Sequence, residues 1–506
     1  MLEVNHMSIK VKDRYIVKDL SFVLNRNDKL AIIGEEGNGK STLLKGILGI
    51  CSYAEVTGDI QKKEYRIGYL EQTLDEENLK KTGYDFLFES DSSYYEKVKN
   101  FYKWLDVLKI NENIIEQEVH TLSGGEKVKL GILKLLLDDN DILFLDEPTN
   151  DLDIETLRWL EDFINKVEKP ILYVSHDETL LANTANQILH LEQIRKKTDC
   201  RWTLLKMGYD AYVCMRLQSI NKQTQVAKAE KREYNKQQEK LMKIMQKVEY
   251  QQNTVSRKNP HEARVLKKKM HSLKSQEKKL DSVSLTQLPD VEEEIHFFFE
   301  DIDLPSRKDI LQFDIPILKI KDKILSKNVK LEIRGNMHLC ILGKNGVGKS
   351  TLIKQIYQEL KDRKDIKLGY MPQNYEEILN QYTYVTDFLS FHKSQEEITK
   401  ARTYLGNMKF TKEEMTGKIK DLSNGTKAKL FLCRFVLDHC NVLILDEPTR
   451  NISPLSNPVL RKVLREYQGT IISVSHDRKY IQEVIQYVYT LTEDGLVKSD
   501  FPVEEK

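Results

Sequence analysis

Short, predominantly apolar segments recur along the chain and end at glycine, at aspartate or at serine. Six of them span residues 30–33, 142–145, 171–174, 339–342, 442–445 and 471–474. A short apolar run bounded in this way is typical of a strand that is buried on both faces of a sheet. The segments at 30–33 and 339–342 are each followed by a glycine-rich loop and then by a helical pattern. This alternation predicts an α/β fold with a parallel-sheet core.

The same pattern occurs twice. At an offset of 300 residues, Leu122–Glu126 recurs as Leu422–Thr426, Leu145–Thr149 as Leu445–Thr449, and Ser175–Asp177 as Ser475–Asp477. A repeat of this kind indicates two copies of one domain of roughly 200 residues in tandem. We expect the first domain at residues 1–212, a linker at 213–288 and the second domain at 289–506.

Between the two copies, mostly apolar positions follow alternating steps of four and three. These steps run through Val213–Val248 and Leu266–Leu280 and include a few polar residues, Thr224, Lys231, Gln238 and Glu277. They predict two amphipathic helices that pair as an antiparallel hairpin. Asn259 and Pro260 suit the N-cap and the first residue of the second helix. The tip of the hairpin is therefore expected at residues 249–258.

Charge is unevenly distributed along the chain. The 506 residues include 79 Lys and Arg and 78 Asp and Glu, for a net charge of +1. The stretch from Arg216 to Leu280 alone carries 18 basic and 6 acidic residues, a net charge of +12. A solvated spacer, the alternative interpretation, would carry mixed charge, whereas this surplus favours binding to a polyphosphate. With only Tyr234 and Tyr250 as aromatic residues there, contact with the backbone of structured nucleic acid is favoured over stacking on single strands.

Composition also excludes some classes of protein. No apolar run approaches the ~18 residues that a membrane helix needs, and no signal-peptide core follows the first methionine. We therefore exclude a membrane pump made of this chain alone and expect no membrane partner. The six cysteines form no CxxC pair, which is typical of free thiols in a reducing compartment and predicts a cytoplasmic protein.

Two loops have the spacing of phosphate-binding loops. Gly34–Ser41 and Gly343–Ser350 both fit GxxxxGK[ST], and each lies between a predicted strand and a predicted helix. Glycine allows backbone N–H groups to face phosphate oxygens, the helix N-terminus favours the anion, and the lysine reaches the β- and γ-phosphates. The residues expected to contact ATP in and beside these loops are Gly34, Gly37, Asn38, Gly39, Lys40, Ser41, Thr42, Gly343, Asn345, Gly346, Gly348, Lys349, Ser350 and Thr351.

Carboxylates at the ends of two predicted strands suit the hydrolysis of a phosphoanhydride. The first carboxylate of each pair would hold Mg²⁺, and the second would orient and deprotonate the attacking water. A histidine 29 residues after the second carboxylate would contact the γ-phosphate. The expected Mg²⁺ ligands are Asp146 and Asp446, and the expected bases are Glu147 and Glu447. The expected γ-phosphate contacts are His176 and His476.

Together these motifs resemble two ATP-binding-cassette (ABC) domains. The resemblance implies head-to-tail pairing of the cassettes within one monomer, with two ATP molecules sandwiched between them. The first phosphate loop would then face Ser423 and Gly425, and the second would face Ser123, Gly124 and Gly125. The resemblance also implies two sets of Mg²⁺ ligands, namely Ser41, Gln72 and Asp146, and Ser350, Gln373 and Asp446.

The two expected sites differ in sequence. Tyr15 is placed like the family's adenine-stacking aromatic residue, although an ordinary strand tyrosine explains it equally well, and position 324, its counterpart, is not aromatic. Asn424 and Thr426 depart from the LSGGE-type signature, and Arg450–Ser453 lacks the aspartate that the family carries there. Because the second site keeps its glutamate and its histidine, we expect both sites to hydrolyse ATP.

Three classes of cassette protein compete. The ATPase of a transporter needs no long basic hairpin between its cassettes, and DNA-repair ATPases place their coiled coil inside one cassette. The chain instead resembles the ABC-F family of translation-associated ATPases, which have tandem cassettes, no membrane domain and a basic helical linker.

Within that family, the chain resembles the Vga-type antibiotic-resistance members. Gln72 and Ser123 are 51 residues apart, which leaves little room for the arm of housekeeping members, and the stretch 447–458 is similar to that of the Vga type. The resemblance implies binding at the ribosomal tRNA exit site, near large-subunit RNA and P-site tRNA, and protection from drugs of the peptidyl-transferase region. A housekeeping translation factor is the alternative. The expected ribosome contacts are Lys267, Lys268, Lys269, Gln251, Gln252, Asn253, Thr254 and Val255.

Overall fold

The protein has two compact units in the computed structural model. One unit comprises Met1–Asp210 and Glu294–Lys506, and the other comprises Ala211–Glu293. The structure describes residues 2–61, 65–88, 94–194, 199–254, 260–282, 286, 299, 304–321, 323–389, 395–408 and 410–500. No helix among these residues combines the length and the apolar character needed to cross a bilayer.

The first cassette is built on a six-stranded sheet with the order β5-β6-β7-β3-β8-β9. All neighbours are parallel except β8 and β9, and a second sheet, β2-β1-β4, is antiparallel. The strands are β1 (Leu2–Val11), β2 (Arg14–Leu24), β3 (Lys29–Ile33), β4 (Glu55–Gln61), β5 (Ile67–Leu70), β6 (Ile142–Asp146), β7 (Ile171–Val174), β8 (Gln187–Ile194) and β9 (Asp199–Leu205). The helices are α1 (Lys40–Leu48), α2 (Glu76–Lys80), α3 (Gly83–Leu87), α4 (Tyr94–Leu108), η1 (Glu112–Ile114), η2 (Val119–Thr121), α5 (Gly124–Leu137), α6 (Ile154–Lys166) and α7 (Glu178–Thr184).

The second cassette repeats this topology. Its main sheet has the order β13-β14-β15-β12-β16-β17, and β10 and β11 form an antiparallel pair. The strands are β10 (Asp309–Ile320), β11 (Lys323–Arg334), β12 (His338–Leu342), β13 (Leu368–Met371), β14 (Val442–Asp446), β15 (Thr470–Val474), β16 (Tyr487–Thr492) and β17 (Gly495–Ser499). The helices are α10 (Lys349–Leu360), α11 (Glu376–Leu379), α12 (Val385–Phe388), α13 (Gln395–Asn407), α14 (Lys412–Thr416), η3 (Ile419–Asp421), α15 (Asn424–Leu437), α16 (Asn457–Glu466) and α17 (Arg478–Val484).

The predicted buried strands are confirmed. All six apolar segments lie in the centres of the two main sheets, as β3, β6, β7, β12, β14 and β15, and every residue of these strands is buried. Because these strands are parallel, their carboxyl ends share one edge of each sheet. The phosphate loops and the carboxylates predicted for catalysis therefore meet at that edge.

A hydrophobic core fixes the helix that follows each phosphate loop. In α1, Leu43, Leu44 and Ile47 are fully buried and pack with residues of the antiparallel sheet and of β3. In α10, Leu352, Ile353 and Ile356 are buried in the same way beneath β10 and β11. Each loop is thus held between a buried strand and a buried helix, which leaves its backbone little freedom to move.

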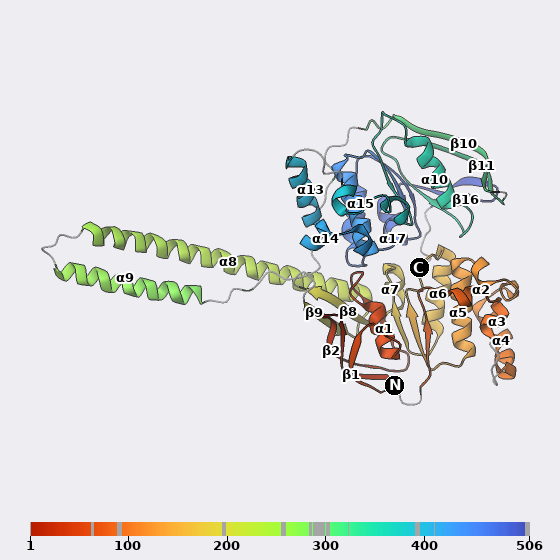
Figure 1. Cartoon of the computed structure of the whole chain (residues 1–506), viewed down its shortest axis with the longest axis horizontal. Coiled ribbons are helices and arrows are strands. Elements are labelled where there is room, and N and C mark those ends of the chain that lie inside the picture. The colour runs from red at the N-terminus through yellow and green to blue at the C-terminus, as the bar shows by residue number, and fades with distance from the viewer. Residues whose placement is uncertain are drawn as a thin grey trace. The chain divides into compact units, whose positions relative to one another are not determined.

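The unit between the cassettes contains the predicted helical hairpin. Helices α8 (Tyr209–Thr254) and α9 (Pro260–Asp281) lie side by side and run antiparallel (Figure 1). The seam between them consists of buried Val248, Leu266 and Leu273, with Leu241, Met245 and Met270 packed against these three. These are apolar positions of the predicted periodicity, and Pro260 begins the second helix as predicted.

The position of the hairpin tip differs from the prediction. Helix α8 continues through Thr254, so residues 249–254 are helical, although they were assigned to the tip. This stretch has no glycine or proline, and its side chains are compatible with a helix. Val255, also predicted at the tip, lies outside the described residues. Lys267, Lys268 and Lys269 are exposed on α9.

Candidate functional site

The first phosphate loop surrounds its lysine. Lys40 begins α1, and its ammonium donates hydrogen bonds to the carbonyls of Gly34 and Glu35 at 2.9 and 3.1 Å. Gly39 precedes it with a φ of 85°, and a Cβ at Gly39 would lie 2.1 Å from the side chain of Ile16. Glycine is therefore required at this turn. Lys40 is held in place by backbone oxygens of its own loop.

The second loop has the same construction. The ammonium of Lys349 donates to the carbonyls of Gly343 and Lys344 at 2.8 and 3.0 Å. The asparagines of the two loops have different partners. Asn38 is buried and donates to the carbonyl of Leu191, so its side chain holds the first loop against β8, whereas Asn345 donates to the carbonyl of Asp151.

A hydroxyl and a carboxylate meet at the expected Mg²⁺ position of the first site. Ser41 Oγ donates to Asp146 Oδ1 at 2.9 Å, and the hydroxyl of Tyr69, a residue that the sequence did not single out, donates to Oδ2 at 3.0 Å. Burial raises the pKa of Asp146, and these two hydrogen bonds oppose the shift. Mg²⁺ is usually held by one or two carboxylates together with substrate phosphates, so this set of oxygen ligands fits the ion.

The second site has the same pair of groups. Asp446 and Ser350 line one cavity with Lys349, and burial raises the pKa of Asp446 to about 6. The two glutamines predicted as further ligands have other partners here. Gln72 donates to Glu147 at 3.4 Å, and Gln373 donates to Asp151 at 3.0 Å.

Each predicted base lies beside its predicted histidine. His176 Nε2 is 3.2 Å from Glu147 Oε1, and His476 Nε2 is 3.9 Å from Glu447 Oε1. Both glutamates have a left-handed backbone, with φ of 49° and 54°. This conformation is uncommon outside glycine and is typical of strained functional positions.

The two bases differ in their electrostatic surroundings. Burial raises the pKa of Glu147, but the charge and hydrogen bond of His176 outweigh this effect and lower the pKa to about 2. Burial raises the pKa of Glu447 to about 8, and the charge of Asp446 adds to the shift. Burial also lowers the pKa of His476 to about 3, with Lys349 adding to that shift. The shorter ion pair thus favours the charged carboxylate in the first cassette.

The signature motifs form the N-termini of two helices. Ser123 caps α5 in a capping box with Glu126, and Ser423 caps α15 by accepting a hydrogen bond from the amide of Thr426. A Cβ at Gly124 would lie 2.6 Å from the carbonyl of Asp151, so the helix end fits closely against that loop. Free N–H groups at such helix ends attract anions.

Both cassettes contribute to one large cavity of about 1110 Å³. Its lining from the second cassette includes Asn345, Gly346, Gly348, Lys349, Ser350, Thr351, Gln373, Asp446, Glu447 and His476. Its lining from the first cassette includes Ser123 and Gly124. Gly125, the third predicted signature residue, instead packs against Thr156. The structure thus brings the second phosphate loop and the first signature together, as head-to-tail pairing predicts.

The first phosphate loop also meets the signature of the other cassette, and two acidic side chains of the loop lie at this contact. The cavity there measures about 30 Å³, and Ser423 and Gly425 line it together with Glu35 and Glu36. The carboxylate of Glu36 accepts a hydrogen bond from the backbone N–H of Gly425. Sequence reasoning missed both glutamates. Their signal was the presence of two acidic residues inside a loop expected to bind phosphates.

Two buried ion pairs join the cassettes. Arg461 of α16 pairs with Glu178 of α7, and Arg478 of α17 pairs with Glu161 of α6. Both arginine side chains are 3% exposed, and the two glutamates are 6% and 11% exposed. Buried charges are stable only when they are paired in this way. Sequence reasoning missed all four residues.

Two remaining predictions concern the edges of the first site. Tyr15 lies on β2 with 44% of its surface exposed, and its counterpart Ile324 lines the large cavity of the second site. Thr42 Oγ1 lies 3.3 Å from the hydroxyl of Tyr53, another tyrosine that the sequence did not single out.

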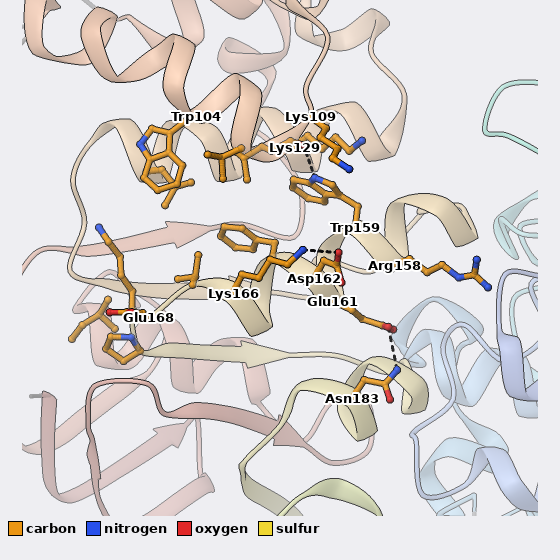
Figure 2. A pocket seen from close by; sticks show the side chains of 18 of the residues that line it. Trp104, Lys109, Lys129, Arg158, Trp159, Glu161, Asp162, Lys166, Glu168 and Asn183 are labelled. Atoms are coloured by element: carbon orange, nitrogen blue, oxygen red, sulfur yellow. Dashed lines mark hydrogen bonds and ion pairs between the residues drawn. The ribbon is translucent and has the colours of Figure 1, made fainter. Parts of the chain in front are cut away.

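A separate cavity of about 1260 Å³ contains none of the predicted nucleotide residues (Figure 2). Trp104 and Trp159 lie on its wall, and the indole N–H of Trp159 donates to the carbonyl of Leu108. The ammonium of Lys129 lies 5.1 Å from the ring of Trp159. Acidic and basic side chains are mixed around this cavity, so its charge favours no one class of ligand.

Comparison with known proteins agrees with this geometry. The profile of the ABC transporter family matches residues 17–150 and 326–450. The putative ATP-binding protein YdiF of Bacillus subtilis is 30% identical over 560 residues, which cover 100% of this chain and 83% of YdiF. The ribosome protection protein VmlR of Bacillus subtilis is 28% identical over 533 residues, which cover 100% of this chain and 89% of VmlR.

The fold also matches solved structures. The archaeal ribosome recycling factor aABCE1, in complex with the ribosomal stalk protein aP1, superposes with a TM-score of 0.60 at 17% identity. The match covers 97% of this chain and 89% of the aABCE1 chain. It shows that the whole two-cassette arrangement is a known fold.

Proposed function

The chain belongs to the ABC transporter family of ATP-binding domains and is an ATPase, and on that premise we propose that it acts on the ribosome in the cytoplasm. We infer that it is an ABC-F protein that binds at the tRNA exit site, against large-subunit RNA and P-site tRNA. In this role it protects translation from antibiotics of the peptidyl-transferase region, of the kind that Vga-type proteins counter.

The observation that carries the proposal is the basic hairpin. Helices α8 and α9 bury only a narrow apolar seam against each other, and Lys267, Lys268 and Lys269 are exposed beside it. The stretch from Arg216 to Leu280 has a net charge of +12, whereas the remainder of the chain has a net charge of −11. Such segregated charge suits the phosphate backbone of structured RNA. The likeness to VmlR, whose name states ribosome protection, supports the same partner.

In this proposal, ATP binding and hydrolysis at the two nucleotide sites drive a cycle of ribosome binding and release. Lys40 and Lys349 would hold the β- and γ-phosphates, and Asp146 and Asp446 would hold Mg²⁺ together with the serine hydroxyls. Mg²⁺ held there would neutralise charge on the phosphates. Glu147 and Glu447, placed by their left-handed backbones, accept a proton from the attacking water. Closure on ATP and reopening after hydrolysis would then set how long the protein stays on the ribosome.

A housekeeping translation factor is the second candidate. The observation that keeps it open is that YdiF, whose name states ATP binding and no ribosome protection, is as similar to this chain as VmlR is. Both candidates bind ribosomes, so ribosome binding alone does not distinguish them, whereas a measurement of drug protection does.

Expression in a drug-susceptible host, with susceptibility testing and ribosome co-sedimentation, tests the proposal. We expect raised resistance to drugs of the peptidyl-transferase region and co-sedimentation that weakens with salt. Ribosome binding without any protection would favour the housekeeping role. Absence of ribosome binding at low salt would refute both candidates.

Charge reversal of Lys267, Lys268 and Lys269 to Glu tests the hairpin. Ribosome binding should weaken and its salt dependence should flatten, because fewer counterions are released. ATPase activity without ribosomes should stay near wild type. Conversion of the same lysines to Arg is the matched control, and it should preserve binding. Unaltered binding by the Glu variant at both low and high salt would favour a solvated spacer.

The end of the hairpin distinguishes resistance from simple binding. Gln251, Gln252, Asn253 and Thr254 end α8 and have small or neutral side chains suited to a narrow RNA-lined pocket. Alanine at all four positions would remove these groups and preserve the helix. We expect ribosome association and ATPase activity to persist while protection falls unequally among drug classes. Unchanged protection against every drug would exclude this segment from the mechanism.

A further inference from the structure

The two phosphate loops differ at two consecutive positions. The first loop has Glu35 and Glu36, and the second has Lys344 and Asn345 at the same places. N–H groups and cations in such a loop strengthen its binding of phosphates, whereas carboxylates weaken that binding because like charges repel. The acidic pair in the first loop therefore needs an explanation of its own.

The structure shows where these carboxylates go. Glu36 accepts a hydrogen bond from the N–H of Gly425 in the first turn of α15, the 14-residue signature helix of the other cassette. Glu35 Oε1 lies 3.4 Å from the ammonium of Lys429 on the same helix. Two anionic side chains thus cover a helix end that would otherwise be available to an anionic ligand.

The surroundings of Glu36 include charges of both signs. Burial raises the pKa of Glu36, whereas the Gly425 amide, His176 and Lys40 lower it and Glu147 raises it. These neighbours belong to the nucleotide machinery proposed above. Glu36 therefore lies among the groups that would surround the terminal phosphate of a bound nucleotide.

The second site gives an internal comparison. Asn345, the counterpart of Glu36, donates its side-chain amide to the carbonyl of Asp151 and not to the signature helix. Ser123 and Gly124 there line a cavity of about 1110 Å³ with Lys349, against about 30 Å³ where Glu36 meets Gly425. The residue type at one loop position thus accompanies the difference between a signature helix that faces a large cavity and one that contacts the opposite loop.

We propose that Glu36 is a built-in competitor of the γ-phosphate at the first site. Its carboxylate holds the Gly425 amide and leaves that position when a nucleoside triphosphate is clamped between the cassettes. ATP therefore binds the first site less tightly than the second, and the second site fills first. The inference rests on the proposed assignment of the two nucleotide sites, but not on any role at the ribosome.

Site-resolved binding of a fluorescent ATP analogue with Mg²⁺ tests the proposal. Lys349→Ala would silence the second site, so that titration of the full-length chain reports the first site alone. In that background, Glu36→Asn, which installs the residue of the second loop, should tighten ATP binding about tenfold, with 1.4 kcal/mol per factor of ten. Glu36→Gln should act alike, and Glu36→Asp should bind ATP no more tightly than the parent chain. In a parallel titration with ADP, the affinity should change less than threefold between these variants, because ADP lacks the γ-phosphate that competes with Glu36.

The reciprocal variant uses the other site. In a Lys40→Ala background, Asn345→Glu should weaken ATP binding to the second site several-fold and change ADP binding little. Thermal unfolding of each variant checks that it is folded. Unchanged or weaker ATP binding in both Glu36→Asn and Glu36→Gln would overturn the proposal, as would equal tightening of ATP and ADP. If Lys40→Ala leaves first-site binding intact, the site assignment itself fails. Loss of drug protection in cells bears only on the ribosomal role.

Discussion

The first and second cassettes share one strand order, yet their buried charges are reversed where they meet. Glu161 and Glu178 of the first cassette correspond, at the offset of 300, to Arg461 and Arg478 of the second. Each glutamate pairs with the arginine at the other position, Glu161 with Arg478 and Glu178 with Arg461. Two copies of the first cassette would bring four carboxylates together, and two copies of the second would bring four guanidinium groups together. The duplicated halves have therefore become complementary to each other and unsuited to pairing with themselves.

Reversal of the buried charges of the first cassette should have the largest effect on this complementarity. Glu161→Arg with Glu178→Arg would place four arginines together in a buried interface, and we expect a loss of more than about 5 kcal/mol of stability. Chemical denaturation and limited proteolysis would measure it. Adding Arg461→Glu and Arg478→Glu should restore much of the loss, because the pairs form again with opposite polarity. A fourfold variant as unstable as the double variant would show that packing, not charge, governs this interface.

Removal of both bases should affect turnover next most strongly. Glu147→Gln with Glu447→Gln keeps the shape of the side chains but accepts no proton, so hydrolysis should fall by about 10²- to 10⁴-fold. ATP binding should persist, and the closed form should accumulate on ribosomes. Single variants sharpen the comparison of the cassettes, since each should retain the turnover of the intact site. Near-normal phosphate release by the double variant would refute the role of these glutamates.

Asp151 offers a smaller test of the second site. It accepts hydrogen bonds from Gln373 and Arg450, whereas its counterpart Asn451 donates to Tyr375. Asp151→Asn should remove the ion pair with Arg450 and slow second-site turnover about three- to fivefold, because the pair is partly exposed. Turnover measured in a Glu147→Gln background isolates that site. Asn451→Asp in a Glu447→Gln background is the matched control, and a similar loss there would contradict the special role of Asp151.

The smallest expected effect concerns Tyr15. Tyr15→Ile gives the first site the residue that lines the second, and it should weaken ATP binding about two- to fivefold if the ring stacks on adenine. Titration in a Lys349→Ala background measures this change. Ile324→Tyr should tighten the second site by a similar factor. Equal affinities before and after both exchanges would identify Tyr15 as an ordinary strand residue.

Features encoded within short stretches of sequence are predictable from them. The buried strands, both phosphate loops and the start of α9 at Pro260 depend on neighbours within a few residues, so periodicity and turn chemistry reveal them. The seam of the hairpin is equally accessible, since its apolar spacing repeats along each helix. The helical state of residues 249–254 is less accessible, because these polar residues contain no helix breaker yet lie beyond the regular apolar spacing of the seam.

Contacts that join the cassettes lie beyond such reasoning. Glu36 and Gly425 are 389 residues apart, and Glu178 and Arg461 are 283 apart. No local pattern signals that one acidic side chain has a distant amide or guanidinium as its partner. The family resemblance predicts which motifs face each other across the interface. The contact of Glu36 with Gly425 and the buried ion pairs lie outside those motifs, so only the three-dimensional structure reveals them.

The left-handed backbone at Glu147 and Glu447 has a consequence for behaviour on warming. A strained φ costs about 1–3 kcal/mol and persists only while the surrounding fold enforces it. Local loosening of the strand end releases this strain at a lower temperature than the one that melts the sheets, because parts of a protein open before the whole. Catalysis should therefore decay on heating while circular dichroism still reports intact cassettes. We therefore expect the temperature range of the ATPase to depend on the anchoring of Glu147 and Glu447, and that of the fold on its cores.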